Sequence, residues 1–197
     1  MTASADSWEH LATEIRGCTR CSELADARTT VVIGQRPVRG ARVLLVGEAP
    51  GANEDETGIP FVGKAGQLLD QLLDEAGLPR AEVAVANVLK CRPPKNRKPT
   101  RVEVANCRGW LTAQIAIVDP ELIVAMGGTA VEWFFGTGAK IGGLRGQVHD
   151  IAGRRVLPTY HPSAAIRFGP GGMPRAALRE DLAVAARQIE NVEQACR

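Results

Sequence analysis

The sequence predicts a doubly wound α/β domain, in which helices cover both faces of a mostly parallel sheet. Three observations lead to this fold class. Aliphatic runs alternate with helical patterns along the chain. The aliphatic runs are continuous, which is typical of strands that are buried on both faces. The length of 197 residues suits a single domain, residues 1–197, with a sizeable core.

Four segments are predicted to be strands, because each is short and rich in aliphatic residues. They are Ala41–Val46, Val83–Leu89, Leu122–Met126 and Arg155–Thr159. Their continuous apolar character favours a parallel arrangement, since strands of a parallel sheet are covered on both sides.

Helices are predicted between these strands from the spacing of apolar residues and from start and stop residues. Ala65–Ala76 places leucines at helical spacing and is followed by Gly77, which suits a helix C-terminus. Thr100 suits the N-cap of a helix over Arg101–Val118, because Glu103 at the third helical position completes a capping box.

Three further helical segments complete the pattern. The Gly127-Gly128-Thr129 turn opens a short helix that extends through Phe135, and Ala176–Gln194 is a terminal amphipathic helix. An N-terminal helical segment, residues 1–30, is expected to contain the cysteine pair Cys18 and Cys21.

Composition and charge are those of a globular chain. Hydrophobic residues make up 45% of the sequence and charged residues 23%. No apolar run approaches the roughly 20 residues that span a bilayer, and the N-terminus lacks the pattern of a secretory signal. We therefore expect a cytoplasmic protein with no membrane partner. The formal net charge of +2 does not by itself indicate a polyanionic partner.

Four of the five cysteines form two pairs. Cys18 and Cys21 make a C-x2-C pair, and 15 residues separate Cys91 from Cys107. In a reducing compartment such cysteines bind metal more often than they form disulfides. Four thiolates suit either a tetrahedral zinc ion or an iron–sulfur cluster, and the spacing leaves both possible. Cys196 is predicted to be a free thiol.

One segment concentrates positive charge. From Lys90 to Arg101, six of twelve residues are basic and none is acidic. Such a run is either a solvated loop or a surface that binds anions. Its two flanking cysteines and its position directly after a strand favour the second interpretation.

Polar residues follow three of the predicted strands, at the edge where open α/β sheets bind their ligands. They are Gly47-Glu48-Ala49-Pro50-Gly51 after the first strand, Asn87 at the second and Tyr160-His161-Pro162-Ser163 after the fourth. Because the carboxyl ends of parallel strands lie on one rim, we expect these segments to converge on one site.

The chemistry at this rim excludes the common phosphate sites. The first loop has neither the lysine of a P-loop nor the G-x-G-x-x-G spacing of a dinucleotide site, and its carboxylates would repel phosphate. A small, neutral, polar ring is a better ligand. Phe61 is either a stacking surface for that ring or ordinary core, and Asn87 either pairs with the ring edge or caps a turn. His161 could donate to an oxygen that gains charge.

Taken together, these residues resemble a known family. GEAPG…GIPFVGKAGQLL, NVLKCRPPKNRKPT and HPSAAIR, with C-x2-C…C-x15-C, look like a family 4 uracil-DNA glycosylase. The similarity extends from about Cys18 to the terminal helix. The first two motifs are specific, and the cysteine pattern is independent of both.

The resemblance implies a three-layer α/β/α sandwich with a central four-stranded parallel sheet. It implies a monofunctional glycosylase that flips uracil out of double- or single-stranded DNA and hydrolyses its N-glycosidic bond in base excision repair. Free uracil and an abasic site would be the products of a monomeric, nucleoid-associated enzyme. The family carries a structural [4Fe–4S] cluster, which would be ligated by Cys18, Cys21, Cys91 and Cys107.

The resemblance also assigns roles around the flipped base. Phe61 would stack on uracil, and Asn87 would pair with its N3–H and O4, which favours uracil over cytosine. Backbone amides of Gly47, Glu48 and Ala49 would contact its oxygens. His161 would stabilise O2 as the base leaves as an anion. Bulk near C5 must exclude thymine, and the side chain of Glu54 is the first candidate.

The residue that positions the attacking water is left open by the resemblance. Family 1 glycosylases supply an aspartate from a G-Q-D-P-Y-H motif, whereas Ala49 stands at that position here. The tyrosine that blocks thymine in family 1 is replaced by Gly51. Family 4 shares both departures, so they do not argue against activity. Glu48 is our candidate for the water-positioning residue, together with His161 as the second catalytic side chain.

Two segments are expected to contact DNA. The loop after His161 resembles the segment that enters the minor groove, where Ile166 or Phe168 would fill the gap left by the base. The basic run would hold the phosphate backbone. The predicted DNA contacts are Lys90, Arg92, Lys95, Arg97, Lys98, Ser163, Ile166 and Arg167.

Two alternative functions come from other classes. A related branch of the superfamily is trapped covalently on uracil-DNA through a histidine in a basic inserted loop, but Lys90–Arg101 contains no histidine. A DNA-binding scaffold with a degenerate pocket would not need Glu48, Phe61, Asn87 and His161, all of which are present. Both alternatives are therefore weaker than catalytic turnover.

Overall fold

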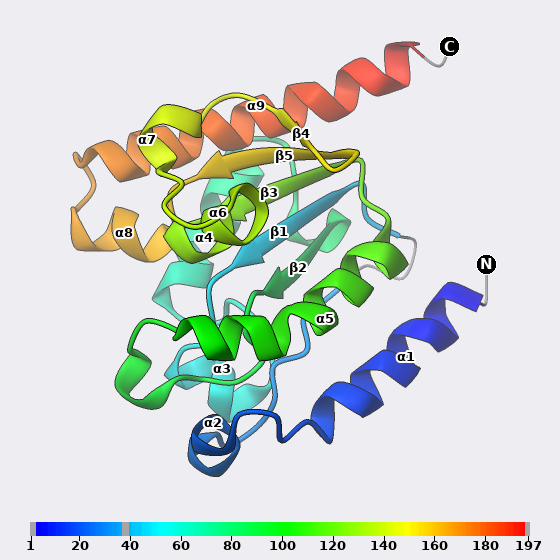
Figure 1. Cartoon of the computed structure of the whole chain (residues 1–197). Coiled ribbons are helices and arrows are strands. Elements are labelled where there is room, and N and C mark those ends of the chain that lie inside the picture. The colour runs from blue at the N-terminus through cyan, green and yellow to red at the C-terminus, as the bar shows by residue number, and fades with distance from the viewer. Residues whose placement is uncertain (1–2, 37–39, 196–197) are drawn as a thin grey trace.

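A five-stranded, mostly parallel sheet forms the centre of the molecule. The computed structural model describes residues 3–36 and 40–195. The strands are β1 (Val43–Gly47), β2 (Val83–Asn87), β3 (Leu122–Met126), β4 (His149–Ile151) and β5 (Arg154–Thr159). Their order across the sheet is β2-β1-β3-β5-β4 (Figure 1). The four predicted strands are confirmed and pair in parallel, and β4 is antiparallel to β5.

The edge strand β4 was not predicted, for a physical reason. It has three residues, none of them buried, so it lacks the apolar run that marks the other strands. It pairs with β5 because Ala152 and Gly153 both have positive φ, which suits the two-residue turn of a hairpin. The chain therefore adds an antiparallel edge to the predicted four-stranded parallel sheet.

Helices and short 3₁₀ turns connect and cover the strands. The helices are α1 (Ala3–Arg16), α2 (Ser22–Ala27), α3 (Ala52–Thr57), α4 (Lys64–Glu75), α5 (Arg101–Val118), α6 (Gly128–Phe135), α7 (Ile141–Leu144), α8 (Pro162–Arg167) and α9 (Met173–Ala195), with 3₁₀ turns η1 (Arg80–Glu82) and η2 (Pro94–Asn96). The predicted capping box of α5 is confirmed, since Glu103 N–H donates to Thr100 Oγ1 and Thr100 N–H donates to Glu103 Oε2. None of the described helices is long and apolar enough to cross a bilayer.

Alternate residues of each strand face different helical layers, as a sheet buried on both sides requires. Val43 and Leu45 of β1 pack in the cluster that contains the apolar residues of α4 and α9. Leu44 and Val46 pack on the opposite face with residues of α5 and α6. The predicted three-layer α/β/α arrangement is confirmed (Figure 1).

Helix α1 extends one outer layer instead of holding the cysteine pair. Its apolar residues Trp8, Leu11 and Ile15 pack in a third cluster with Trp110 of α5. The helix ends at Arg16, and Cys18 and Cys21 lie in the turn that leads into α2. The predicted helical segment over residues 1–30 thus consists of two helices, and the cysteine pair lies in the turn between them and not on a helix.

Candidate functional site

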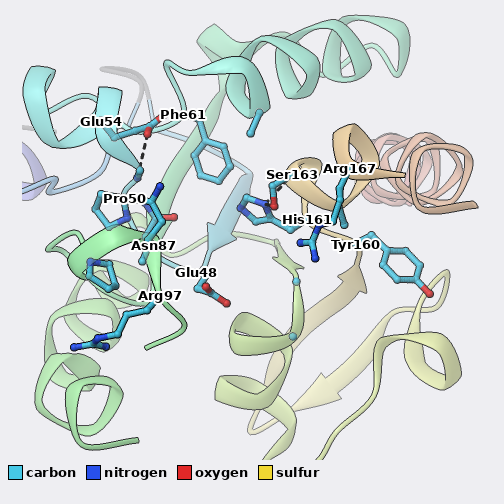
Figure 2. Close-up of a pocket in the computed structure, with 18 of the residues that line it drawn as sticks. Glu48, Pro50, Glu54, Phe61, Asn87, Arg97, Tyr160, His161, Ser163 and Arg167 are labelled. Carbon is cyan, nitrogen blue, oxygen red and sulfur yellow. Dashed lines mark hydrogen bonds between the residues drawn. The ribbon is translucent and has the colours of Figure 1, made fainter. Parts of the chain in front are cut away.

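The strand-end segments converge on one pocket, as the strand-end rule predicts. The pocket has a volume of about 450 Å³ and lies at the carboxyl ends of the parallel strands. Its walls include Glu48, Glu54, Phe61, Asn87 and His161 (Figure 2). Ala49, Arg97, Ser163 and Arg167 also line it. Figure 2 shows the rings of Phe61 and His161 and the amide of Asn87 around one shared space, with Glu48 below them.

Phe61 is fixed at the pocket wall by close backbone packing. Its φ of 57° is unusual for a bulky residue. Gly66 makes this conformation possible, because a Cβ at that position would lie 1.6 Å from the carbonyl oxygen of Phe61. The rings of Phe61 and His161 are 5.6 Å apart between centroids and tilted by 33°. Phe61 therefore packs in the core cluster and also lines the pocket beside the imidazole.

Asn87 presents an unpaired acceptor at the end of β2. The residue is 3% exposed, and its Oδ1 is buried without a hydrogen-bond partner among the described residues. An unpaired buried acceptor is costly, so such atoms are rare and indicate a ligand or water site. Gly47, opposite Asn87 in the sheet register, leaves the space, because a Cβ there would lie 2.4 Å from Asn87 Oδ1.

His161 is held in one tautomer by the start of α8. The ring Nδ1 lies 3.1 Å from the backbone nitrogen of Ser163 and 2.8 Å from its Oγ. Because a backbone N–H can only donate, Nδ1 accepts, and the neutral ring carries its proton on Nε2. Burial lowers the pKa of His161 to about 4, although the nearby carboxylate of Glu54 acts in the opposite direction. The ring is therefore a neutral donor at pH 7.

Glu48 is oriented by a residue that the sequence analysis missed. Thr129 Oγ1 donates to Glu48 Oε2 at 2.5 Å. Thr129 belongs to the Gly127-Gly128-Thr129 turn, which was interpreted only as a helix start. This turn follows β3, so the strand-end rule that placed the other segments at the rim also applies to it. Glu48 is half-buried, with one carboxylate oxygen held by Thr129.

Glu54 joins the two halves of the segment between β1 and α4. Its carboxylate accepts from the backbone N–H groups of Gly51 at 3.0 Å and of Val62 and Gly63 at 2.9 Å each. The acidic segment predicted as a loop therefore contains the helix α3, whose N-terminus Glu54 caps. These three bonds fix the Glu54 side chain at the pocket wall.

The basic run divides into exposed and engaged residues. Lys95 and Lys98 are exposed, and Arg92 donates to Asn96 Oδ1 at 2.8 Å. Arg97 pairs with both oxygens of Glu103, at 2.7 and 2.9 Å, and with Glu23 at 3.1 Å. Arg97 thus holds the basic segment against α2 and α5, and its contact with DNA stays a prediction.

The expected contact of Lys90 with DNA was wrong. Lys90 is 1% exposed, and its Nζ donates to the backbone oxygen of Asn87 at 2.5 Å. Burial lowers its pKa to about 8, and the sulfur atoms of Cys107 and Cys91 act in the opposite direction. The sequence pattern could not separate Lys90 from the other basic residues of the run, because it shows which side chains are charged but not which are buried.

The segment after His161 forms a short helix, α8, instead of the expected loop. Ile166 and Phe168 are 43% and 64% exposed, which is unusual for large apolar side chains. Ser163 lies at the pocket, where it bonds the imidazole, and Arg167 also lines the pocket. The segment predicted to enter the minor groove therefore carries exposed apolar side chains. Its insertion into DNA stays a prediction.

The four paired cysteines lie around a second, smaller pocket. Cys18, Cys21, Cys91 and Cys107 all line it. Arg28 donates to Cys91 Sγ at 3.1 Å, Trp110 Nε1 to Cys18 Sγ at 3.4 Å and Asn106 Nδ2 to Cys21 Sγ at 3.5 Å. Burial raises the pKa of Cys91 and raises that of Cys107 to about 11. Cys196, the predicted free thiol, lies outside the described residues.

Comparisons with known proteins identify relatives of this chain. A model of the uracil DNA glycosylase superfamily matches residues 33–183. A type-4 uracil-DNA glycosylase from Thermotoga maritima is 44% identical over 87% of this chain and 90% of that protein. A second, from Sulfurisphaera tokodaii, is 39% identical over 89% of this chain and 82% of that protein. A type-5 uracil-DNA glycosylase from Pyrobaculum aerophilum is 35% identical over 74% of this chain and 78% of that protein.

Proposed function

The chain belongs to the uracil DNA glycosylase superfamily, and from that membership we propose how its rim pocket removes uracil from DNA. It is a uracil-DNA glycosylase, a hydrolase that breaks an N-glycosyl bond in DNA repair. In our proposal it acts as a monomer and releases free uracil, leaving an abasic site. Because a stacked base is out of reach, the uracil must first be turned out of the helix into the pocket.

The unpaired Oδ1 of Asn87 is the observation that carries this proposal. Uracil offers N3–H as a donor beside O4 as an acceptor, and a side-chain amide offers the complementary pair. Oδ1 would accept from N3–H and the amide NH₂ would donate to O4. Cytosine exchanges donor and acceptor at this edge, so it would leave Asn87 mispaired in a buried site. Phe61 would support the base by stacking.

The neutral imidazole of His161 would stabilise the leaving base. As the bond between C1′ and N1 breaks, its electron pair moves to the base, and the negative charge spreads to O2. The Nε2–H would donate to O2 as that charge develops. This hydrogen bond would be stronger in the transition state than in the bound substrate. The sugar becomes oxocarbenium-like, so the attacking water needs orientation more than strong activation.

Glu48 is our proposal for orienting this water. Thr129 holds Oε2, so the other carboxylate oxygen would be free to accept from the water. The water oxygen forms the new bond to C1′ and gives up one proton to solvent, and the uracil anion takes up one proton to become free uracil. The carboxylate would also favour positive charge on the sugar. Replacing Thr129 with Val would remove the hydrogen bond to Glu48 while keeping nearly the same side-chain volume.

The rigid Glu54 side chain supports its proposed role in excluding thymine. Its carboxylate is bound by three backbone N–H groups, so it cannot swing away to admit a methyl group at C5. Because the same bonds hold the pocket wall together, Glu54 would serve both the shape of the pocket and its selectivity.

We expect excision to continue as the pH falls through 6.5, the usual pKa of histidine, and to decline only near pH 4. The working form of His161 is neutral, and its pKa is lowered. In the same interval the unfolded chain binds a proton that the folded chain does not, so stability falls as the pH decreases. Single-turnover rates and the nitrogen NMR signals of His161 over this range measure both effects. Loss of rate centred near pH 6.5, in step with titration of His161, would contradict this role.

The exposed lysines of the basic run are proposed to bind DNA phosphates. Replacing Lys95 and Lys98 with Ala should reduce the slope of log K against log salt by about 1.4 to 1.8, because each phosphate contact contributes about 0.7 to 0.9. The matched control removes two positive charges elsewhere, Lys140→Ala with Arg187→Ala. An unchanged slope in the Lys95 and Lys98 variant would show that this segment is only solvated.

We propose that the four paired cysteines hold a [4Fe–4S] cluster. The donor set fits, since four thiols share one pocket and three side-chain N–H groups point at their sulfur atoms. Four cysteine thiolates are the ligand set of such a cluster, which would be held by Cys18, Cys21, Cys91 and Cys107. When bound, the cluster would join the turn before α2 to the start of the basic run and to α5.

The absorption spectrum and metal content of the purified protein test this cofactor. We expect a brown protein with iron and sulfide in equal amounts, which loses its visible absorption and unfolds at a lower temperature after oxidation and chelation of the iron. Lys140→Ala, a change at an exposed residue before α7, is the control and should alter neither property. A colourless protein fully loaded with zinc would overturn the cluster assignment.

Turnover, as opposed to covalent trapping, is tested on a denaturing gel with uracil-containing DNA. We expect an abasic product in excess over enzyme and no shifted protein–DNA band. A stoichiometric band of higher mass would support the trapping alternative.

A further inference from the structure

Lys90 is a buried cation between the cysteine site and the end of β2. Its side chain is among the largest in the described residues that are almost fully buried. It lines the same pocket as the four paired cysteines. A lysine is seldom buried without a partner, because its charge loses the solvation of water. The ammonium of Lys90 has two kinds of partner, the backbone oxygen of Asn87 and the nearby sulfur atoms.

The backbone of Lys90 is fixed by the cysteine site. Its backbone N–H bonds the sulfur of Cys107, and the next residue, Cys91, is itself one of the four paired cysteines. Its carbonyl oxygen accepts from Val32 N–H at 2.8 Å. The backbone of residue 90 is therefore held by Cys107, Cys91 and Val32, independently of its side chain.

The side chain then extends back to the residue that faces the base. Lys90 Nζ donates to the carbonyl oxygen of Asn87 at 2.5 Å, three residues earlier in the chain. Between them, Val88 N–H and Leu89 N–H donate to the carbonyl oxygens of Gly47 and Glu48 at 2.9 and 3.0 Å. The turn after β2 is thus attached to β1 at one side and to the cysteine site at the other.

We propose that Lys90 is a positioning residue for base recognition, because its ammonium fixes the Asn87 peptide and thereby the direction of the Asn87 amide. The inference rests on the proposed function. Among the residues that the structure describes, Asn87 Oδ1 has no partner to hold it, so the backbone must aim the side chain at the pocket. Lys90 supplies that constraint and connects it to the four cysteines. It does not touch the base itself.

A double-mutant cycle on the protein as purified tests this role. Lys90→Met keeps the length and apolar stem of the side chain but removes the donor and the charge. We expect it to lower the single-turnover rate of uracil excision at least about 10-fold in the wild-type background and less than about 3-fold in the Asn87→Ala background. Iron content, sulfide content and melting temperature are measured for every variant. Arg187→Met, which removes an exposed charge on α9, is the matched control and should match the wild type.

Lys90→Gln is the second variant, because it keeps an N–H donor without the charge. We expect it to retain bound iron and to recover part of the rate lost in Lys90→Met. The proposal is overturned if Lys90→Met lowers the rate equally in both backgrounds, or if both variants lose their iron or fail to fold, since Lys90 would then act on stability or on the cysteine site. Absence of excision by the wild type would instead refute the proposed function.

Discussion

Asn87→Asp should lower the single-turnover rate of uracil excision by about 10²-fold or more. In the proposed complex the amide would donate to O4 of uracil, whereas a carboxylate would place a negative charge against that carbonyl oxygen. Asn87 is 3% exposed, so with the base bound in the pocket the mispaired oxygen atoms would be poorly solvated. Sites built to hydrogen-bond a ligand discriminate strongly against the wrong hydrogen-bonding pattern.

The measurement compares rates on oligonucleotides that carry uracil or cytosine at one position. We expect the ratio of uracil to cytosine excision to fall in the Asn87→Asp variant, because a carboxylate accepts from the amino group of cytosine. Gln147→Glu makes the same amide-to-acid change at an exposed residue between α7 and β4 and should leave the ratio unchanged. Excision of uracil by Asn87→Asp at the wild-type rate would rule out the base-reading role.

His161→Asn should lower the rate of the chemical step by about 10²- to 10³-fold, the usual effect of removing one donor to a developing oxyanion. Asn is chosen because His161 caps α8 in addition to its proposed catalytic role. Its Nδ1 caps α8, and an Asn side chain at an N-cap can accept the same bond from Ser163 N–H. The shorter amide does not extend to the place of Nε2, so the variant separates catalysis from capping.

Steady-state and single-turnover kinetics distinguish these roles. The loss is expected in kcat, with KM nearly unchanged, because the proposed bond to O2 would strengthen as the base leaves. The melting temperature should stay close to that of the wild type. A His161→Asn enzyme within about 3-fold of the wild-type rate would contradict the assignment of His161 as the donor to O2.

Much of the fold follows from local rules that act within short segments. The Thr100 and Glu103 capping box was predicted from residue type and spacing, and the structure has both of its hydrogen bonds. The convergence of Asn87 and His161 was predicted from a topological rule, because parallel strands end on one rim. Neither prediction needed knowledge of side-chain packing.

The missed features depend on contacts between distant segments. Lys90 has the same charge as Lys95 and Lys98, and only the neighbouring cysteines and the Asn87 carbonyl distinguish its buried position. Glu54 was considered for its bulk, and its three bonds to backbone N–H groups emerge only when α3 folds. Thr129 could have been found with the strand-end rule applied to β3.

The most direct test of this pocket measures single-turnover excision from three oligonucleotides. They are identical except for uracil, cytosine or thymine at one position, so the rates show whether the pocket selects and releases uracil alone. Release of free uracil from the first oligonucleotide alone is the predicted result, since in our proposal Asn87 selects the pyrimidine edge and Glu54 closes the space at C5. Comparable release of cytosine or thymine, or no release from any of the three, would contradict the assignment of this pocket.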